Sequence, residues 1–174
     1  SMKEQRRKSL FEQPLTTLSA AVFDLETTGF QPRAGDEILS IGAVTAEGCR
    51  VLEQETFYSL ANPGKEVPPE ITRLTGITTE MAAEAPPLID ALQRFFAFVK
   101  KRVLIVHAAG HDKPFLNAAL WKTSRVSLTH HVLDTMMIAK WLHPELENHD
   151  LDTMLSRYDI PIEGRHHALA DSVM

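Results

Sequence analysis

The hydrophobic and polar positions in the first third of the chain follow a β-strand pattern. Residues 18–23 form a short apolar run that a Thr-Thr-Gly turn closes at Gly29, which is typical of a buried strand. Residues 37–45 and 50–60 are rich in β-forming side chains and are separated by an Ala-Glu-Gly turn, which predicts a hairpin. We therefore expect these three strands to pair as an antiparallel meander.

The rest of the chain changes to helical spacing interrupted by short apolar runs. A short helix is predicted to begin at Pro68-Pro69, with proline in its permitted first turn. Apolar side chains at helical spacing predict a longer helix through Leu88, Leu92, Phe95, Phe96 and Val99. The apolar run 103–106 follows that helix and predicts a buried strand parallel to the first. We also expect a helix over 114–122, a short strand at 132–134 and helices over 135–142 and 150–158.

This order of elements predicts an α/β fold: a mixed five-stranded sheet, made of the antiparallel meander plus parallel strands, flanked by helices. The length of 174 residues favours one domain, which we place at residues 18–174 after an N-terminal extension of residues 1–17. We expect a helix that begins near Ala168 to be truncated at Met174. Several large apolar side chains on the later helices are expected to pack in the core: Trp121, Met136, Met137, Trp141 and Met154.

Composition and charge exclude several classes of protein. Hydrophobic residues make up 44% and charged residues 24% of the chain, as in ordinary globular proteins and unlike disordered ones. No stretch approaches the roughly 20 consecutive apolar residues of a membrane span, so we expect a cytoplasmic protein with no membrane partner. The net charge of −5 argues against a broad basic face for duplex nucleic acid. A nucleic-acid role would need a local site at which metal ions supply the positive charge.

Asp24 and Glu26 are the first candidates for such a site. They are two residues apart at the end of the first predicted strand, so they point to the same side of the sheet, about 7 Å apart at roughly 3.3 Å per residue. Burying two carboxylates together is unfavourable unless a cation neutralises them, and oxygen ligands favour Mg²⁺ or Mn²⁺. By itself an Asp-x-Glu pair is more often a solvated strand end.

Two later segments also carry acids beside histidines. His107 follows the predicted strand 103–106, and Asp112 lies at the start of the helix predicted next. Near the end of the chain, His166 precedes a predicted helix that contains Asp171. This pattern would place a carboxylate on a rigid element with an imidazole nearby, although a single histidine and aspartate pair of this kind is usually structural.

Taken together, the three segments resemble the three motifs of the DEDDh family of 3′→5′ exonucleases, and are most similar to its proofreading epsilon subunits of bacterial DNA polymerase III. The first motif matches as Asp-Leu-Glu-Thr-Thr-Gly at 24–29. The second, usually His-Asn-Ala-x-Phe-Asp, is present as His-Ala-Ala-Gly-His-Asp at 107–112. The third, usually His-x-Ala-Leu-x-Asp-Ala, is present as His-His-Ala-Leu-Ala-Asp-Ser at 166–172. The resemblance runs from about Leu18 to the end and implies a ribonuclease H-like fold.

The resemblance also implies a site for two Mg²⁺ or Mn²⁺ ions. Two such ions about 3.5 to 4 Å apart can hold the attacking and the leaving oxygen during phosphodiester cleavage. The positions of the family's acidic metal ligands are Asp24, Glu26, Asp112 and Asp171. His166 matches the general base, with His167 as a second candidate. The family's contacts to the terminal nucleotide correspond to the substrate-binding residues Leu25, Thr27 and Thr28.

The chain departs from the family pattern in the second motif. His111 stands where phenylalanine is usual, and three interpretations stay open: a core histidine, a third imidazole in the site, or a mark of altered substrate choice. Alanine replaces asparagine at Ala108, and Thr75 stands where the family often has histidine. A zinc site is disfavoured because the remaining histidines have no recognised ligand spacing: His130, His131, His143 and His149.

We therefore expect a metal-dependent 3′→5′ exonuclease of proofreading or repair type. Its substrate would be single-stranded or frayed 3′ ends of DNA, its products nucleoside 5′-monophosphates, and its candidate partner a DNA polymerase subunit. An RNA-trimming exoribonuclease is an alternative, because these motifs do not display the contacts that read a 2′-hydroxyl. An alternative of another class is a non-catalytic nucleic-acid-binding or polymerase-tethering module, which the full set of acids argues against.

Overall fold

A computed structural model describes residues 14–48 and 50–159. Its five strands are β1 (Ser19–Thr27), β2 (Ile38–Glu47), β3 (Arg50–Leu60), β4 (Val103–Val106) and β5 (Val132–Asp134). Its α-helices are α1 (Pro69–Thr75), α2 (Thr79–Ala83), α3 (Leu88–Val99), α4 (Ala109–Ser124), α5 (Thr135–Leu142) and α6 (Leu151–Arg157). The predicted site residues His166, His167 and Asp171 lie outside the described part of the chain.

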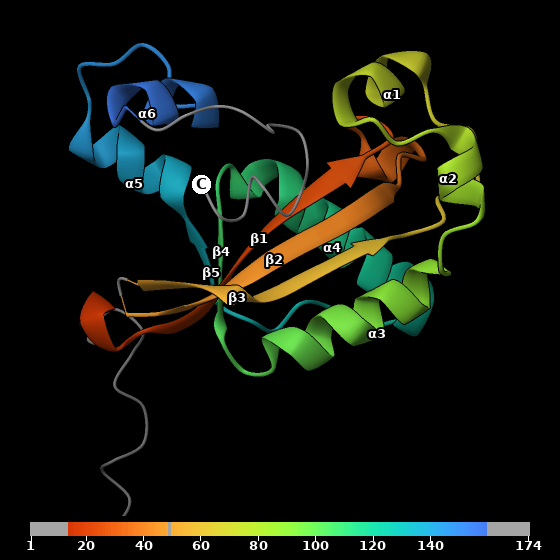
Figure 1. Ribbon diagram of the computed structural model, residues 1–174, viewed down its shortest axis with the longest axis horizontal. Coiled ribbons are helices and arrows are strands. Elements are labelled where there is room, and N and C mark those ends of the chain that lie inside the picture. Colours follow the sequence, from red (N-terminus) through yellow and green to blue (C-terminus); the bar gives the residue numbers. More distant parts are fainter. Residues whose placement is uncertain (1–13, 49, 160–174) are drawn as a thin grey trace, which may run out of the picture.

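The strands form one sheet in the order β3-β2-β1-β4-β5 (Figure 1). β1, β2 and β3 pair antiparallel, as the hairpin pattern predicts. β4 pairs parallel to β1, and β5 pairs parallel to β4. A helix precedes each of these two strands and returns the chain to the end of the sheet at which β1 begins, so the strands run in the same direction. The predicted α/β fold with a mixed five-stranded sheet is confirmed.

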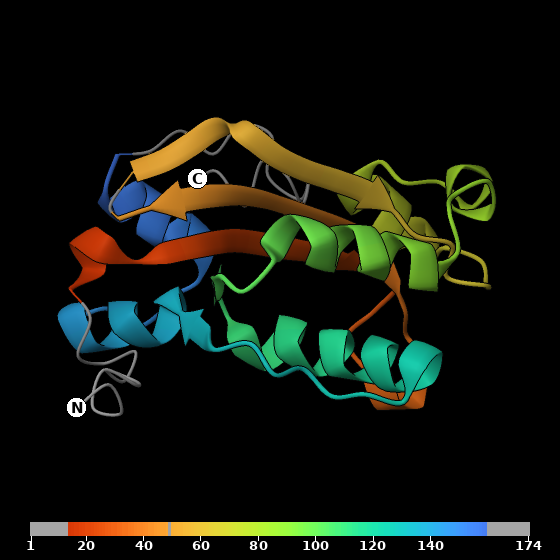
Figure 2. The ribbon, with the colours of Figure 1, turned by 90° about the horizontal axis from the view of Figure 1, so that it is seen from below.

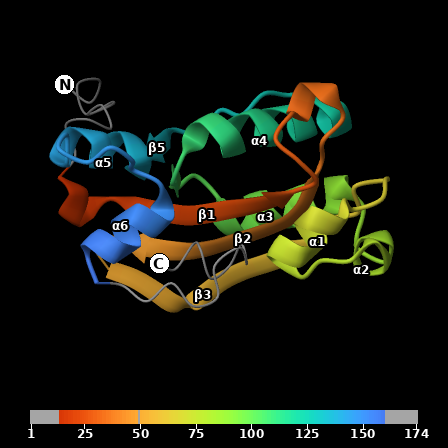
Figure 3. The ribbon, with the colours of Figure 1, turned by 90° about the horizontal axis from the view of Figure 1, so that it is seen from above.

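Helices cover both faces of this sheet. α3 and α6 lie on opposite faces, which Figures 1 and 3 show from two directions. α1 and α2 pack around Leu39 of β2 through a small separate cluster that includes Ile71 and Ile77. Within the described residues, no helix is both long and apolar enough to cross a membrane.

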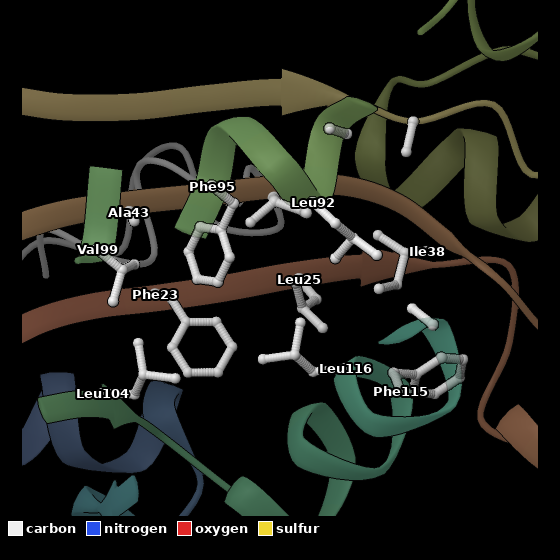
Figure 4. Packing of buried hydrophobic residues seen from close by; sticks show 14 of the residues in the cluster. Phe23, Leu25, Ile38, Ala43, Leu92, Phe95, Val99, Leu104, Phe115 and Leu116 are labelled. Atoms are coloured by element: carbon white, nitrogen blue, oxygen red, sulfur yellow. The ribbon is translucent and has the colours of Figure 1, made fainter. Parts of the chain in front are cut away.

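The main core lies between the sheet and the pair α3 and α4. Phe23 and Leu25 of β1 point into it, where they meet Phe95 of α3 and Leu116 of α4 (Figure 4). Because successive side chains of a strand point to opposite faces, the residues that alternate with this apolar set must face the other side of the sheet. The core packing of β1 therefore determines where its two acids point.

α4 begins at Ala109, five residues before the predicted start near Pro114. The sequence prediction placed proline in the first turn, where it is favoured, but the preceding residue, Ala108, forms the actual cap with φ 65 and ψ 61. Its N–H donates to Oδ1 of Asp134, 3.0 Å away. This contact with a distant residue supports the earlier start and brings Asp112 into the first turn of the helix.

The prediction that both tryptophans pack in the core is wrong. Trp121 is 56% exposed and Trp141 is 81% exposed, and Met137 is exposed as well. α4 buries a neighbouring stripe that contains Phe115, Leu116, Ala119 and Leu120. Met154 is buried as predicted. Hydrophobic character alone did not show which side of each helix meets the sheet.

Candidate active site

The two acids of β1 lie on the face of the sheet opposite to the main core. Phe23 and Leu25 point toward α3 and α4, so strand alternation turns Asp24 and Glu26 to the other side, as predicted. Glu26 is buried and Asp24 is half-buried. The pairing register shifts between Glu26 and Thr27, an irregularity of the kind that bends a strand and re-aims its side chains.

Asp112 reaches the same place from the first turn of α4. Asp112 is 3% exposed and lines the same pocket as Asp24 and Glu26. Burial raises the pKa of Asp112 well above its ordinary value, and the negative charges of Asp24 and Glu26 raise it further, against the lowering effect of the Leu25 N–H. The structure thus brings together three of the four predicted acids.

This cluster fits a divalent cation by its donor chemistry. Oδ2 of Asp112 is buried and finds no hydrogen-bond partner among the described residues, whereas buried carboxylate oxygens are usually satisfied. A cation with a preference for oxygen ligands would supply that partner and offset the repulsion among the acids. Residues 14–48 and 50–159 contain no group of three His, Cys, Asp or Glu side chains arranged to hold a metal ion, so these acids by themselves do not make a metal site.

A pocket of about 280 Å³ opens beside the acids. Two of the predicted substrate-binding residues, Leu25 and Thr27, line it, together with Leu74 of α1. Phe30 also lines the pocket and is 79% exposed. Sequence reasoning missed Phe30, for which the only signal was an aromatic residue directly after the Thr-Thr-Gly turn. The lining of the pocket therefore combines acidic with apolar side chains.

Thr28 holds the loop after β1 in place. Its side chain is buried, its hydroxyl donates to Oδ1 of Asp36 at 3.0 Å, and the N–H of Glu37 donates to the hydroxyl at 3.0 Å. Asp36 also accepts from the N–H of Gln31 at 3.0 Å. Burial acts to raise the pKa of Asp36, but the hydrogen bonds from Gln31 and Thr28 and the charge of Lys65 outweigh it and lower that pKa. No pattern in the sequence indicated this role for Asp36.

The same loop has no room for a side chain at Gly29. A Cβ atom at this position would lie 2.4 Å from Oδ2 of Asp36, closer than non-bonded atoms approach. The glycine of the first motif therefore lets the Asp36 carboxylate pack against the backbone that precedes Phe30.

His111 lies in the wall of the pocket. Its ring packs between Phe30 and Phe115, with centroid distances of 5.7 and 5.0 Å. Nε2 lies 3.5 Å from Oγ1 of Thr27 and 3.7 Å from Oδ1 of Asp112. Burial lowers the pKa of His111. The Thr27 hydroxyl donates to the carbonyl of Gly29 at 2.7 Å, so the lone pairs of its oxygen are what it presents to Nε2 of His111.

His107, the first histidine of the second motif, has a structural role. Its Nδ1 lies 2.8 Å from the hydroxyl of Thr135, and its Nε2 lies 2.8 Å from the carbonyl of His149. Both ring nitrogens are therefore engaged in joining the end of β4 to α5 and to the segment before α6.

Three further histidines also contact protein atoms: His130, His143 and His149. Nε2 of His149 lies 2.6 Å from the carbonyl of His143, and Nε2 of His130 lies 2.6 Å from the carbonyl of Lys100. The ring of His143 contacts the hydroxyl of Tyr158 and the carboxylate of Glu145.

Comparison with known proteins places the chain in a family. The profile of the exonuclease family RNase_T matches residues 21–174, a range that includes all three motifs. The chain belongs to this family. The match confirms the resemblance found in the sequence and the expected enzyme class, an exonuclease.

Individual relatives agree with this assignment. A DNA polymerase III subunit epsilon-like protein of Rhodobacter capsulatus is 38% identical over 167 residues, which are 95% of this chain and 24% of that protein. The PolC-type DNA polymerase III of Bacillus subtilis is 34% identical over 152 residues, which are 87% of this chain and 10% of that protein. The chain thus spans a quarter or less of the length of these relatives.

A solved structure supports the fold assignment. The crystal structure of E. coli exonuclease I in complex with a dA16 oligonucleotide has a TM-score of 0.73 and 19% identity to this chain, and the match covers 90% of this chain and 39% of that one. The ribonuclease H-like fold implied by the motifs is confirmed.

Proposed function

We propose that this chain removes nucleotides from the 3′ ends of DNA in a metal-dependent reaction and releases nucleoside 5′-monophosphates. The observation that carries the proposal is the convergence of Asp24, Glu26 and Asp112 beside the pocket, with Oδ2 of Asp112 unpartnered among the described residues. A module that only binds nucleic acid would gain nothing from such a cluster, because it repels phosphate. Membership of the exonuclease family supports the same reaction.

In this proposal, two Mg²⁺ or Mn²⁺ ions would be held by Asp24, Glu26, Asp112 and Asp171. Ions bound there would neutralise charge on the scissile phosphate and make a bound water more acidic. The chain's own part is to hold the carboxylates in place: the first turn of α4 carries Asp112, and β1 presents Asp24 and Glu26 on one side. Asp24 is the proposed shared ligand, because it lies on the central strand β1 and lines the pocket together with Glu26 and Asp112.

The general base of the proposed reaction is His166. It would accept the proton of the attacking water, as the resemblance to the third motif implies. The spacing to Asp171 favours His166 over its neighbour His167, since the family pattern places the base five residues before the last acid.

The terminal nucleotide is proposed to enter the pocket lined by Leu25, Thr27 and Phe30. Apolar and aromatic surfaces stack against any base, which suits an enzyme that trims without sequence preference. DNA is the proposed substrate because the relatives carry the names of DNA polymerases and exonuclease I was solved with a DNA oligonucleotide. The same relatives support a polymerase subunit or domain as a partner.

The test compares a 5′-labelled single-stranded DNA with an RNA of the same sequence, each incubated with Mg²⁺, Mn²⁺ or EDTA. We expect a metal-dependent ladder that shortens from the 3′ end of the DNA, and we expect Asp24→Asn and Asp112→Asn to abolish it. A faster ladder from the RNA would assign the chain to the exoribonucleases instead. DNA that is bound but stays intact with Mn²⁺ would contradict the proposal and favour the non-catalytic module.

A further inference from the structure

A stretch of the chain next to the acidic pocket is itself free of acidic residues. Residues 113–133 contain no aspartate or glutamate, although the whole chain has 23 acidic and 18 basic residues. The same stretch contains Lys113, Lys122 and Arg125. A local basic surface is therefore available in a chain whose net charge is −5.

Four side chains of this stretch form a row along α4. Lys113, Asn117, Trp121 and Arg125 are spaced four residues apart, so they are neighbours on one ridge of the helix; we call this set the α4 row. Lys113, Trp121 and Arg125 are exposed, and Asn117 is half-buried. Lys122 lies beside this ridge and forms a salt bridge with Glu37, with Nζ 2.7 Å from Oε1. Its charge is therefore already paired, and it does not belong to the α4 row.

The α4 row begins at the pocket and leads away from it. Lys113 directly follows Asp112, which lines the pocket, and Arg125 is the residue that ends the helix. At a rise of about 1.5 Å per residue, the row is about 18 Å long. Figures 2 and 3 show α4 along one side of the molecule, running from near the middle of β1 toward η3 (Pro32–Ala34). A few nucleotides of single strand would cover this length.

The far end of the row combines an indole with a guanidinium. The Arg125 guanidinium lies 5.7 Å from the ring centroid of Trp121, within range of a cation–π contact. Trp121 does not pack in the core, and its exposed indole is a surface on which a base can stack. Exposed aromatic rings next to cations are the usual means of binding single strands without sequence preference.

Arg125 adopts a backbone conformation that arginine does not favour. Its φ of 55 and ψ of 33 are left-handed, a conformation that favours glycine or asparagine at the end of a helix. Glycine adopts this conformation without strain, so replacing Arg125 by glycine removes the side chain at no cost to the backbone.

We propose that the α4 row binds the single-stranded DNA that lies upstream of the nucleotide in the pocket. Lys113 and Arg125 contact backbone phosphates, and a base stacks on Trp121. This inference rests on the proposed function, since it takes the pocket as the place of the 3′ end. Single-stranded nucleic acid is favoured over an acidic protein segment because the row is continuous with that pocket and carries a stacking surface.

The test measures binding without cleavage. The fluorescence anisotropy of a labelled oligothymidylate long enough to span the row is followed in EDTA. Trp121→Ala is expected to raise Kd about tenfold through the loss of one stacked base. Arg125→Gly is expected to lower the slope of log Kd against log salt by about 0.7, the value for one phosphate contact on a single strand. Arg125→Gly should not lower the melting temperature, because glycine suits a left-handed φ.

Two control variants match these changes. Lys100 is an exposed cation with a φ of 57 at the end of α3, so Lys100→Gly removes the same charge from another position with a positive φ. Trp141→Ala removes an exposed indole from α5. Both controls are expected to leave Kd and its salt dependence unchanged.

The outcomes separate this inference from the proposed function. Unchanged DNA binding in Trp121→Ala and Arg125→Gly, or equal losses in the controls, would overturn the inference. A dinucleotide occupies only the pocket, so the row variants and the parent chain should cleave it at the same rate. If the row variants no longer cleave the dinucleotide, the defect lies in the pocket and the inference is also overturned. If the parent chain cleaves nothing but binds the oligothymidylate through the row, the proposed function fails and the inference stands.

Discussion

Asp24 of β1 and Asp112 of α4 line the same pocket, and the negative charge of Asp24 raises the pKa of Asp112. Burial is the larger cause of this raised pKa, and the charge of Glu26 adds to it. Without a cation to offset these effects, Asp112 binds a proton more readily in the folded chain than in the unfolded one.

This proton predicts how stability depends on pH in EDTA. The unfolded chain releases the Asp112 proton near pH 4, whereas the folded protein retains it to higher pH. Over this interval the folded state binds more protons, so its free energy of unfolding should fall as pH rises, until the raised pKa is passed. Melting temperatures measured in EDTA across a pH series would show the fall.

Asp112→Asn should flatten that pH dependence, because the amide cannot titrate. Near neutral pH the variant should also melt higher, by roughly 2–4 °C for each kcal/mol gained in a chain of this size. Asp90→Asn, which removes an exposed acid from α3, is the matched control and should not change the slope. An Asp112→Asn variant with an unaltered pH slope would contradict the assignment of the proton.

Gly29→Ala should destabilise the loop that lines the pocket. The new Cβ would lie 2.4 Å from Oδ2 of Asp36, so that carboxylate must give up its bonds with Thr28 and Gln31. We expect a loss of about 1–3 kcal/mol in the free energy of unfolding, measured by urea titration. Gly110→Ala is the control: a Cβ there meets no atom within 4 Å, and alanine favours helix, so stability should stay equal or rise. Equal effects in both variants would refute the role of Asp36.

Ala108→Asn should stabilise the chain. Ala108 has a left-handed φ of 65 before α4, a conformation that asparagine tolerates better than alanine. The expected gain is roughly 0.5–1 kcal/mol in the free energy of unfolding. Ala118→Gly, within the same helix, should instead lose about 1 kcal/mol. A destabilised Ala108→Asn would show that backbone strain is not what limits this position.

His166→Ala should slow DNA cleavage by about 10² to 10⁴-fold while the Kd for DNA in EDTA stays the same, since a general base acts in the chemical step. Single-turnover cleavage with Mg²⁺ measures the first quantity and anisotropy the second. His131→Ala, which removes an exposed imidazole, serves as the control. If the rate does not change in His166→Ala but falls in His167→Ala, the base is His167.

Local patterns were enough to predict most of the fold. The apolar run before Asp24, the hairpin turn and the helical spacing through Leu92 and Phe95 each reflect contacts made within one element or between neighbours. They predicted all five strands and the parallel placement of β4 and β5. The start of α4 was missed because it depends on the bond from Ala108 to Asp134, which no local pattern contains.

Motif spacing is a property of the chain, so it was enough to identify the family and to predict Asp24, Glu26 and Asp112 as site residues. The burial of Asp112, the lack of a partner for one of its oxygens among the described residues and the exposure of Trp121 became visible only in the folded chain. Burial, pKa and exposure depend on groups that are distant in the chain and meet only after folding. For that reason the chemistry of the site could be predicted from residue types, whereas its electrostatics and the surface beside it could not.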